Sequence, residues 1–337
     1  MGHRIIIFAE PRVPWVPSLL NAIVTALEER SDLDWVKVCA TSQEASRIHL
    51  VGRSLSRFAV KALFNPRMAA NYERPRMTTV TSVANSHGVE LIRPPNYSIN
   101  DPGFIRDLQA RYRPTMALSL ACLQIWSAEL LEIFDLAVNF HNGYLPDYKG
   151  LWATHWSLYN GERFSGYAFH VMDAGIDTGP IIIRDRVPVK PDDSPIAVDR
   201  RKIKSARANI EKLLDAMISG SFDSMAQEKG GSYFSGRASV RLWTIDDPRA
   251  LTANEFFRRL RCFAPLKIRF GEATYPVTSL RQARGRRWPL SFVTADGVTL
   301  YPDRLQYVPT WLYLAAGKIK DLFFGRPNRP CGTDLGM

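Results

Sequence analysis

Residues 4–9 form an uninterrupted apolar run, Ile-Ile-Ile-Phe-Ala after Arg4, and a stretch with helical spacing follows. Continuous runs rich in β-branched residues are typical of strands that are buried on both faces of a sheet. From Val16 to Arg30 the apolar residues recur at helical intervals, and residues 35–41 form a second apolar run. The order strand, helix, strand predicts a right-handed βαβ unit. We therefore expect the chain to begin with an α/β fold on a parallel sheet.

The same alternation continues for about two thirds of the chain. It predicts helices at 79–87, 101–111, 127–133, 150–160 and 195–220, and strands at 89–92, 115–120, 136–140, 166–172 and 181–189. After Gly230-Gly231 the pattern changes to short strands at 267–275, 277–280, 290–293 and 298–301, with a helix at 253–262 that Thr252 caps. We predict an α/β domain with a mostly parallel sheet (1–229), a small β-rich module (235–303), and a C-terminal helix and tail (304–337), with the helix at 310–324.

Composition narrows the class of protein. The 337 residues are 46% apolar and carry 44 Lys and Arg against 33 Asp and Glu, a net charge of +11 that favours anionic partners. The four cysteines are far apart, which predicts free thiols in a reducing compartment and no zinc site. The first apolar run is too short for a signal peptide, and no run of 18 apolar residues exists. We expect a cytoplasmic protein without a transmembrane helix.

Polar residues gather at the end of one predicted strand. Asn139 and His141 are two apart, so they project from the same side of the strand, and Asp177 follows in a loop. An amide can hold a developing oxyanion, while an imidazole beside a carboxylate can exchange protons near neutral pH. Each residue alone would more often be an ordinary surface or turn residue. Their joint occurrence in this order indicates a catalytic site.

Four motifs make the chain similar to the folate-dependent formyltransferase family. They are Asn139-x-His141, Tyr144-Leu-Pro-x-Tyr-Lys-Gly150, the helix end from Trp156 to Asn160-Gly-Glu162, and Asp173-x-Gly-x-Asp177-Thr-Gly179. Asp177 lies 36 residues after His141 (177 − 141), the spacing that members of this family use. The resemblance covers roughly residues 3–190. It implies a Rossmann-like catalytic domain, 10-formyltetrahydrofolate as formyl donor, and no metal.

The resemblance also implies roles for individual residues. Asn139 would hold the oxyanion, His141 would polarise the formyl oxygen and share proton transfer, and Asp177 would tune His141 and relay protons. The pterin would lie against two segments, whose candidate residues are Leu118, Ser119, Leu120, Ala121, Cys122, Leu123, Asp173, Gly175 and Ile176. On the acceptor side we expect Asn142, Tyr144, Tyr148 and Trp152, either as an aromatic platform or as ordinary core. We expect His155 and His170 to be structural.

Three branches of the family differ in the amine that they formylate. Glycinamide ribonucleotide enzymes usually need only the catalytic domain, so the extra residues argue against that branch. Methionyl-tRNA formyltransferases have a C-terminal β-barrel, and the basic charge of this chain suits tRNA. The usual family loop after the histidine reads Ser-Leu-Leu-Pro, however, whereas this chain has Asn142-Gly-Tyr-Leu-Pro146. We therefore favour a nucleotide-linked amino sugar over nucleic acid as the acceptor, with a homodimer as an open option.

Two basic segments have alternative interpretations. Residues 44–77 contain seven Arg or Lys residues that include Arg53 and Arg57, and form either a solvated helix and loop or a flap that holds a diphosphate. The basic C-terminal residues between Arg258 and Arg287 form either a solvated face or a tRNA surface. Two other classes stay open: a 10-formyltetrahydrofolate hydrolase, and a non-catalytic descendant that binds nucleic acid or, through residues 311–324, a membrane. The intact Asn, His and Asp argue against loss of catalysis.

Overall fold

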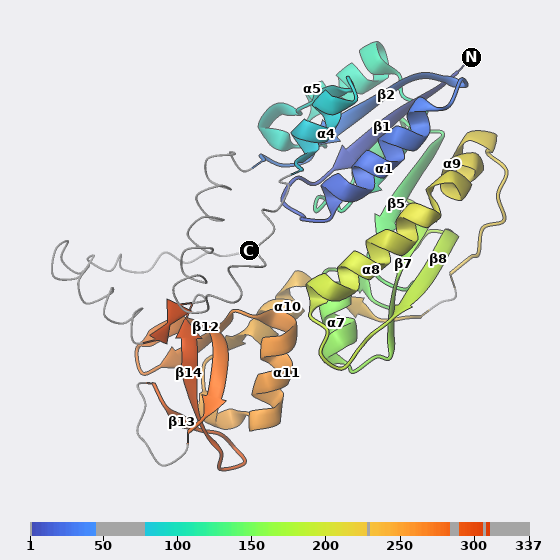
Figure 1. Ribbon diagram of the computed structural model, residues 1–337. Helices are drawn as coiled ribbons and strands as arrows, with labels where there is room; N and C mark the ends of the chain where they lie inside the picture. The colour runs from blue at the N-terminus through green and yellow to red at the C-terminus, as the bar shows by residue number, and fades with distance from the viewer. Residues whose placement is uncertain (1, 45–77, 228–229, 284–289, 306–307, 311–337) are drawn as a thin grey trace. The chain divides into compact units, whose positions relative to one another are not determined.

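The computed structural model describes residues 2–44, 78–227, 230–283, 290–305 and 308–310 (Figure 1). The chain divides into two compact units, Met1–Ser239 and Val240–Met337. The predicted basic segment beyond Glu44 and the predicted helix beyond Thr310 lie outside the described residues. Within the described residues, no helix is both long enough and apolar enough to cross a membrane.

The first unit is built on a seven-stranded sheet in the order β3-β2-β1-β4-β5-β7-β8. The strands are β1 (His3–Ala9), β2 (Leu33–Ala40), β3 (Glu90–Ile92), β4 (Met116–Leu120), β5 (Leu136–His141), β7 (Phe164–Val171) and β8 (Ile181–Pro188). The five strands from β3 to β5 pair in parallel, whereas β7 and β8 continue the sheet in antiparallel fashion. The predicted α/β class with a mostly parallel sheet is confirmed.

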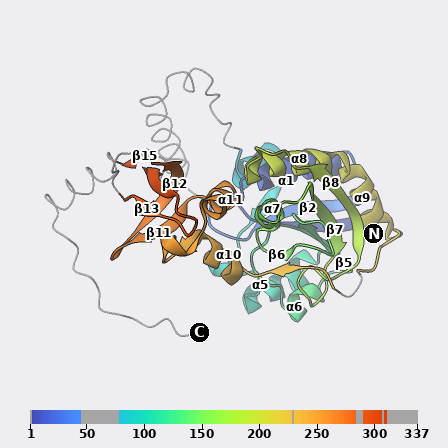
Figure 2. The ribbon, with the colours of Figure 1, turned by 90° about the horizontal axis from the view of Figure 1, so that it is seen from below.

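Helices cover both faces of this sheet, as the view in Figure 2 shows. One face carries α1 (Val16–Glu28), α4 (Val80–Ser86), α8 (Pro195–Ala208) and α9 (Ile210–Ser219). The other carries α5 (Pro102–Asp107), the single π-helical turn η2 (Leu108–Tyr112) and α6 (Ala128–Leu131). The remaining elements of the unit are η1 (Pro95–Tyr97), β6 (Lys149–Gly150), α7 (Ala153–Tyr159), β9 (Tyr233–Phe234) and α10 (Gly236–Trp243).

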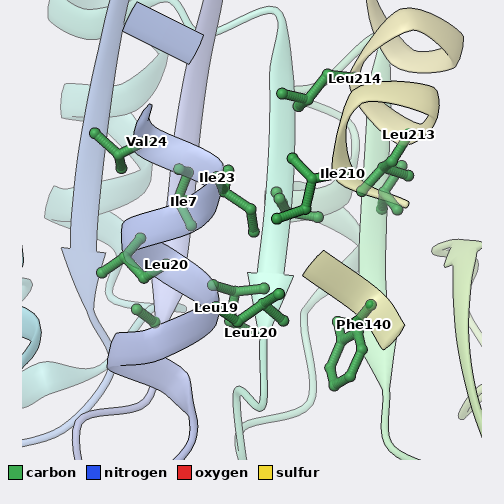
Figure 3. Packing of buried hydrophobic residues seen from close by; sticks show 14 of the residues in the cluster. Ile7, Leu19, Leu20, Ile23, Val24, Leu120, Phe140, Ile210, Leu213 and Leu214 are labelled. Atoms are coloured by element: carbon green, nitrogen blue, oxygen red, sulfur yellow. The ribbon is translucent and has the colours of Figure 1, made fainter. Parts of the chain in front are cut away.

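Strand β1 shows why the first apolar run has no polar residue. Ile5 and Ile7 pack into the core under α1 and α9, whereas Ile6 and Phe8 pack into the core on the opposite face. Figure 3 shows the first of these cores, in which Leu19 and Ile23 of α1 belong to the same cluster as Ile7 of β1. Burial of one such side chain contributes about 1.5–3 kcal/mol. The core thereby fixes the carboxyl ends of the parallel strands.

The prediction of one long helix over 195–220 is wrong. The chain leaves helical geometry at Asn209, where φ is −104° and ψ is 5°, and α8 ends there before α9 begins. The Asn209 side-chain amide donates to Tyr167 Oη at 2.9 Å and to the Ser205 carbonyl at 3.2 Å. An asparagine that bonds locally in this way competes with the helical hydrogen bonds.

The second unit is β-rich, as predicted, and also contains helical elements. Its elements are β10 (Thr244–Ile245), η3 (Pro248–Ala250), α11 (Ala253–Phe263), β11 (Leu266–Phe270), β12 (Ala273–Gln282), β13 (Phe292–Val293), β14 (Thr299–Leu305) and β15 (Val308–Pro309). Thr252 caps α11, because its hydroxyl accepts from the Glu255 backbone N–H at 3.3 Å. The predicted strand 267–275 is wrong, since Gly271 adopts a φ of +60° and turns the chain back into β12. Pro276 lies within β12 and does not end a strand.

Candidate active site

The structure brings the three predicted catalytic residues together at the carboxyl end of β5. Asn139 and His141 project from the same side of β5, and Asp177 lies in the loop between β7 and β8. His141 Nδ1 is 3.2 Å from Asp177 Oδ2, and Asn139 Nδ2 donates to Asp177 Oδ1 at 3.3 Å. In open α/β sheets this edge is where ligands bind.

The Asp177 carboxylate is held from several sides. The residue has a positive φ of 53°, and Gln227 Nε2 donates to its backbone carbonyl at 2.9 Å. The Gly150 backbone N–H donates to Asp177 Oδ2 at 2.8 Å. Burial raises the pKa of Asp177, but the neighbouring His141 and His170 rings and the hydrogen bond from the Gly150 N–H outweigh it and lower the pKa to about 2. Asp177 is therefore ionised at neutral pH.

His141 faces hydrogen-bond acceptors on both ring nitrogens. Its Nε2 donates to the Tyr148 backbone carbonyl at 2.7 Å, while Nδ1 faces Asp177. Burial lowers the pKa of His141, and although Asp177 opposes this effect, the net direction is downward. Asp177 thus raises the pKa of His141 as expected for a nearby carboxylate, but loss of solvation outweighs this effect. The loop also passes so close that a Cβ at Gly143 would lie 2.5 Å from Nε2, so only glycine fits there.

His170 belongs to this cluster, although we predicted a structural role for it. The antiparallel register of β5 and β7 places it directly opposite Asn139. Its Nδ1–H donates to the Val171 carbonyl at 2.8 Å, which leaves Nε2 as an acceptor for Asn139 Nδ2 at 3.1 Å. The same Nε2 is 3.4 Å from Asp177 Oδ1. No sequence pattern could have shown this, because it follows from strand register.

A segment beyond the predicted domain boundary holds the loop at 148–150. Strand β9 pairs with β6 in parallel, and Tyr148 N–H donates to Ser232 Oγ at 2.8 Å. The Phe234 ring stacks on Tyr148 at 5.5 Å between centroids and on Trp156 at 4.3 Å. The Tyr148 carbonyl accepts from His141, and the Gly150 N–H donates to Asp177. Residues 232–234 therefore support the catalytic cluster through the loop at 148–150.

The residues predicted to bind the acceptor differ in how far their side chains are exposed and in their partners. Asn142 turns its amide into the protein, where Nδ2 donates to Asp199 Oδ1 at 2.9 Å and to Thr154 Oγ1 at 3.1 Å. The Tyr144 ring lies 4.8 Å from the Arg184 guanidinium. Tyr148 Oη donates to Glu162 at 2.6 Å, and burial raises the pKa of the Tyr148 hydroxyl. Trp152 has a positive φ of 64° and is 43% exposed, and its ring contacts His155 edge-on. Trp152 is thus the most exposed aromatic ring of the set.

The residues predicted for the pterin lie on both sides of a strand end. Leu118, Ser119 and Leu120 are buried within β4, whose backbone pairs with β1 on one side and β5 on the other. Ala121, Cys122 and Leu123 follow the strand, and Leu123 is 52% exposed. On the other segment Ile176 is 40% exposed, and Asp173 Oδ1 accepts from the Gly175 N–H at 3.0 Å and from Thr178 Oγ1 at 2.6 Å. Exposed apolar side chains beside free backbone groups fit a flat heterocycle.

Two further observations concern the thiols and metals. Cys39, Cys122 and Cys262 are free thiols, as predicted for these three. In the described part of the chain, no group of three His, Cys, Asp or Glu side chains is arranged to hold a metal ion.

Comparisons with known proteins agree with this architecture. Residues 64–213 match the family model described as formyl transferase. Methionyl-tRNA formyltransferase of Geobacter sulfurreducens is 27% identical over 227 residues, which cover 66% of this chain and 62%, less than two thirds, of that protein. The structure is similar to a sugar N-formyltransferase from a Shewanella species, with a TM-score of 0.55 and 16% identity over 88% of this chain and 96% of that one.

A second similar structure is the N-formyltransferase of Helicobacter canadensis in complex with folinic acid and dTDP-3-aminofucose. Its TM-score is 0.56 at 16% identity, over 88% of this chain and 98% of that one. At 16% identity, these two structures show that the fold is shared. The match over residues 64–213 agrees with the resemblance read from the motifs.

Proposed function

We propose that this protein transfers a formyl group from 10-formyltetrahydrofolate to the primary amine of a nucleotide-linked amino sugar. The observation that carries the proposal is the cluster of Asn139, His141 and Asp177 at the carboxyl end of β5. It supplies a donor for an oxyanion, a proton-exchanging ring and an ionised carboxylate within contact distance of one another.

The reaction needs these three functions. The amine attacks the formyl carbon, a C–N bond forms, and the carbonyl oxygen gains negative charge that the Asn139 amide and His141 stabilise. The amine then loses a proton, and N10 of the folate gains one as its bond to the formyl carbon breaks. His141 and the ionised Asp177 lie where they can carry that proton, directly or through a water held by the carboxylate. Atoms and charge balance without any further reagent.

The formyl donor is a folate in this proposal. Leu123 and Ile176 are exposed apolar side chains from the two segments that flank the catalytic cluster. A pterin ring could pack on them and bond to backbone groups of residues 121–123 and 173–176. The similarity to the Helicobacter canadensis enzyme, whose structure contains folinic acid, supports this assignment.

Two observations favour an amino sugar over tRNA as the acceptor source. The similar structure from Shewanella is a sugar N-formyltransferase, and the one from Helicobacter canadensis contains dTDP-3-aminofucose. In the second unit, Arg258 and Arg259 both pair with Glu255, and Arg269 pairs with Asp246 at 2.8 Å. These ion pairs reduce the positive charge available to a phosphate backbone. The 27% identity to methionyl-tRNA formyltransferase keeps tRNA as the second candidate.

An amine panel tests the proposal. The protein is incubated with 10-formyltetrahydrofolate and, in separate reactions, dTDP-, UDP- and GDP-linked amino sugars, methionyl initiator tRNA, or no amine. We expect tetrahydrofolate release with a nucleotide-linked amino sugar, and none from His141→Ala protein. Tetrahydrofolate release only with methionyl-tRNA would identify tRNA as the acceptor, and formate production without an amine would identify a hydrolase. No turnover in any reaction would refute formyl transfer.

The nucleotide end of the acceptor can be tested separately. Arg53 and Arg57, which lie outside the described residues, are proposed to hold the diphosphate. Unchanged acceptor KM in Arg53→Ala and Arg57→Ala proteins would contradict that role.

A further inference from the structure

A fully buried lysine lies behind the loop that follows His141. Lys202, on α8, is 0% exposed, and its Nζ donates to the Asn142 backbone carbonyl at 3.0 Å and to Thr154 Oγ1 at 2.8 Å. Removal of an ammonium group from water costs several kcal/mol. A lysine in this place therefore needs a reason, and neither hydrogen bond reaches a surface where substrate could bind.

The lysine is part of a polar network around Asn142. Asn142 Nδ2 donates to Asp199 Oδ1 at 2.9 Å, and the Thr154 hydroxyl donates to the same oxygen at 2.7 Å. Lys202 and Asp199 come from α8 and Thr154 comes from α7, so two helices hold a single loop residue. Buried networks of this kind fix side chains and backbone in one arrangement. The residue held in this way is the immediate neighbour of His141.

The charge of Lys202 also acts on His141. Burial is the main cause that lowers the pKa of His141, and the charges of Lys202 and His170 act in the same direction, against Asp177. These groups come from α8, from β7 and from the loop after β7. Burial lowers the pKa of Lys202 and of His155 of α7, and the charge of Asp199 acts against this effect in both.

We infer that Lys202 is a positioning residue for His141: it anchors the backbone carbonyl of Asn142, the residue that follows His141 in the chain. The inference rests on the proposed role of His141 in formyl transfer. Lys202 itself does not contact the reacting atoms. The network explains why Asn142 turns away from the catalytic cluster.

Lys202→Met removes the ammonium and keeps a side chain of similar length. The matched control is Lys204→Met, because Lys204 is an exposed lysine of the same helix. For each protein we would measure kcat and KM by tetrahydrofolate release. The titration midpoint of His141 would come from NMR of protein labelled at histidine, with the signal assigned from a His141→Gln variant.

We expect Lys202→Met to lower kcat about tenfold, since a small misplacement of a catalytic group costs about that much or more. KM for the formyl donor should not change, and the His141 midpoint should move to higher pH because a positive charge is lost. Lys204→Met should match the wild type in all three. A Lys202→Met protein that folds, as circular dichroism would show, and keeps both kcat and the His141 midpoint would overturn the inference.

A second variant guards against misfolding of the first. Thr154→Val removes the hydroxyl that joins Lys202 to Asp199 but leaves the ammonium in place. We expect kcat to fall severalfold with an unchanged His141 midpoint. If Lys202→Met does not fold, wild-type kcat in Thr154→Val overturns the inference. If no amine is formylated by the wild type, the proposed function fails, whereas the NMR midpoint still decides whether Lys202 acts on His141.

Discussion

Replacement of Phe234 by alanine tests whether residues 232–234 hold the catalytic loop. The ring lies between Tyr148 and Trp156, at 5.5 and 4.3 Å between centroids and with interplanar angles of 17° and 22°. A stacked pair contributes about 0.5–1.5 kcal/mol beyond its buried area, so two pairs amount to about 1–3 kcal/mol. Replacement of a completely buried phenylalanine by alanine costs about 3–5 kcal/mol of stability. The Phe234 ring is half-buried, so we expect a smaller cost. We expect the free energy of unfolding to fall by about 2–3 kcal/mol.

The catalytic consequence follows from the loop that Phe234 supports. The Tyr148 carbonyl accepts from His141, and the Gly150 N–H donates to Asp177. A shift of about 1 Å in such groups can cost about a hundredfold in rate, so we expect kcat to fall between about tenfold and a hundredfold. A Cβ at Gly150 would lie 2.5 Å from the Phe234 carbonyl, which shows how closely the two segments approach.

The assays are urea unfolding followed by circular dichroism and tetrahydrofolate release under saturating substrates. Tyr233→Ala is the control, because Tyr233 belongs to the same short strand but is 55% exposed. It should change neither quantity appreciably. A Phe234→Ala protein that is less stable but has wild-type kcat would refute the reasoning, since the loop would then be held by other contacts.

Four further predictions concern the titratable groups. Asp177→Asn and His141→Ala should each lower kcat by about a hundredfold or more, measured by tetrahydrofolate release, and near-normal turnover in either would contradict the assigned roles. The depressed pKa of Asp177, about 2 against 3.8, corresponds to about 2 kcal/mol of stability. That stability is present above pH 4 and is lost as the pH falls through 2, so the difference in unfolding free energy between wild type and Asp177→Asn should shrink over this range. Burial lowers the pKa of Lys202 from 10.5 to about 7. The unfolded chain therefore binds a proton between pH 7 and 10.5 that the folded chain does not, and the unfolding free energy should rise with pH in this window in the wild type but not in Lys202→Met. Urea unfolding at pH 7.5 and 9.5 measures this change, and an equal change in unfolding free energy in wild type and Lys202→Met would refute the prediction. His170→Leu should lower kcat about tenfold, because Asn139 loses the acceptor that orients its amide, and unchanged kinetics would leave His170 with the structural role first predicted.

In the first unit, the strands and helices were predicted correctly when their burial produces a recognisable pattern of apolar residues. The run at residues 4–9 is apolar throughout because both faces of β1 are covered, so its pattern could be read directly. The break at Asn209 could not be predicted, because it depends on a hydrogen bond to Tyr167, 42 residues away in the sequence. In the second unit, Gly271 rather than Pro276 marks the turn, since a positive φ stops a strand more surely than a proline at a tolerant position.

The candidate site shows the same division between local pattern and tertiary register. The two-residue period placed Asn139 and His141 on one side of β5, and their proximity to Asp177 followed from order along the sheet. His170 joined them only through the pairing of β5 with β7. The alternation also had a further consequence: one residue beyond His141, it directs Asn142 to the opposite side, where Lys202 of α8 lies. A polar residue one position away from a catalytic residue on a strand projects from the opposite side. It is therefore better placed to fix the position of the catalytic residue than to bind substrate.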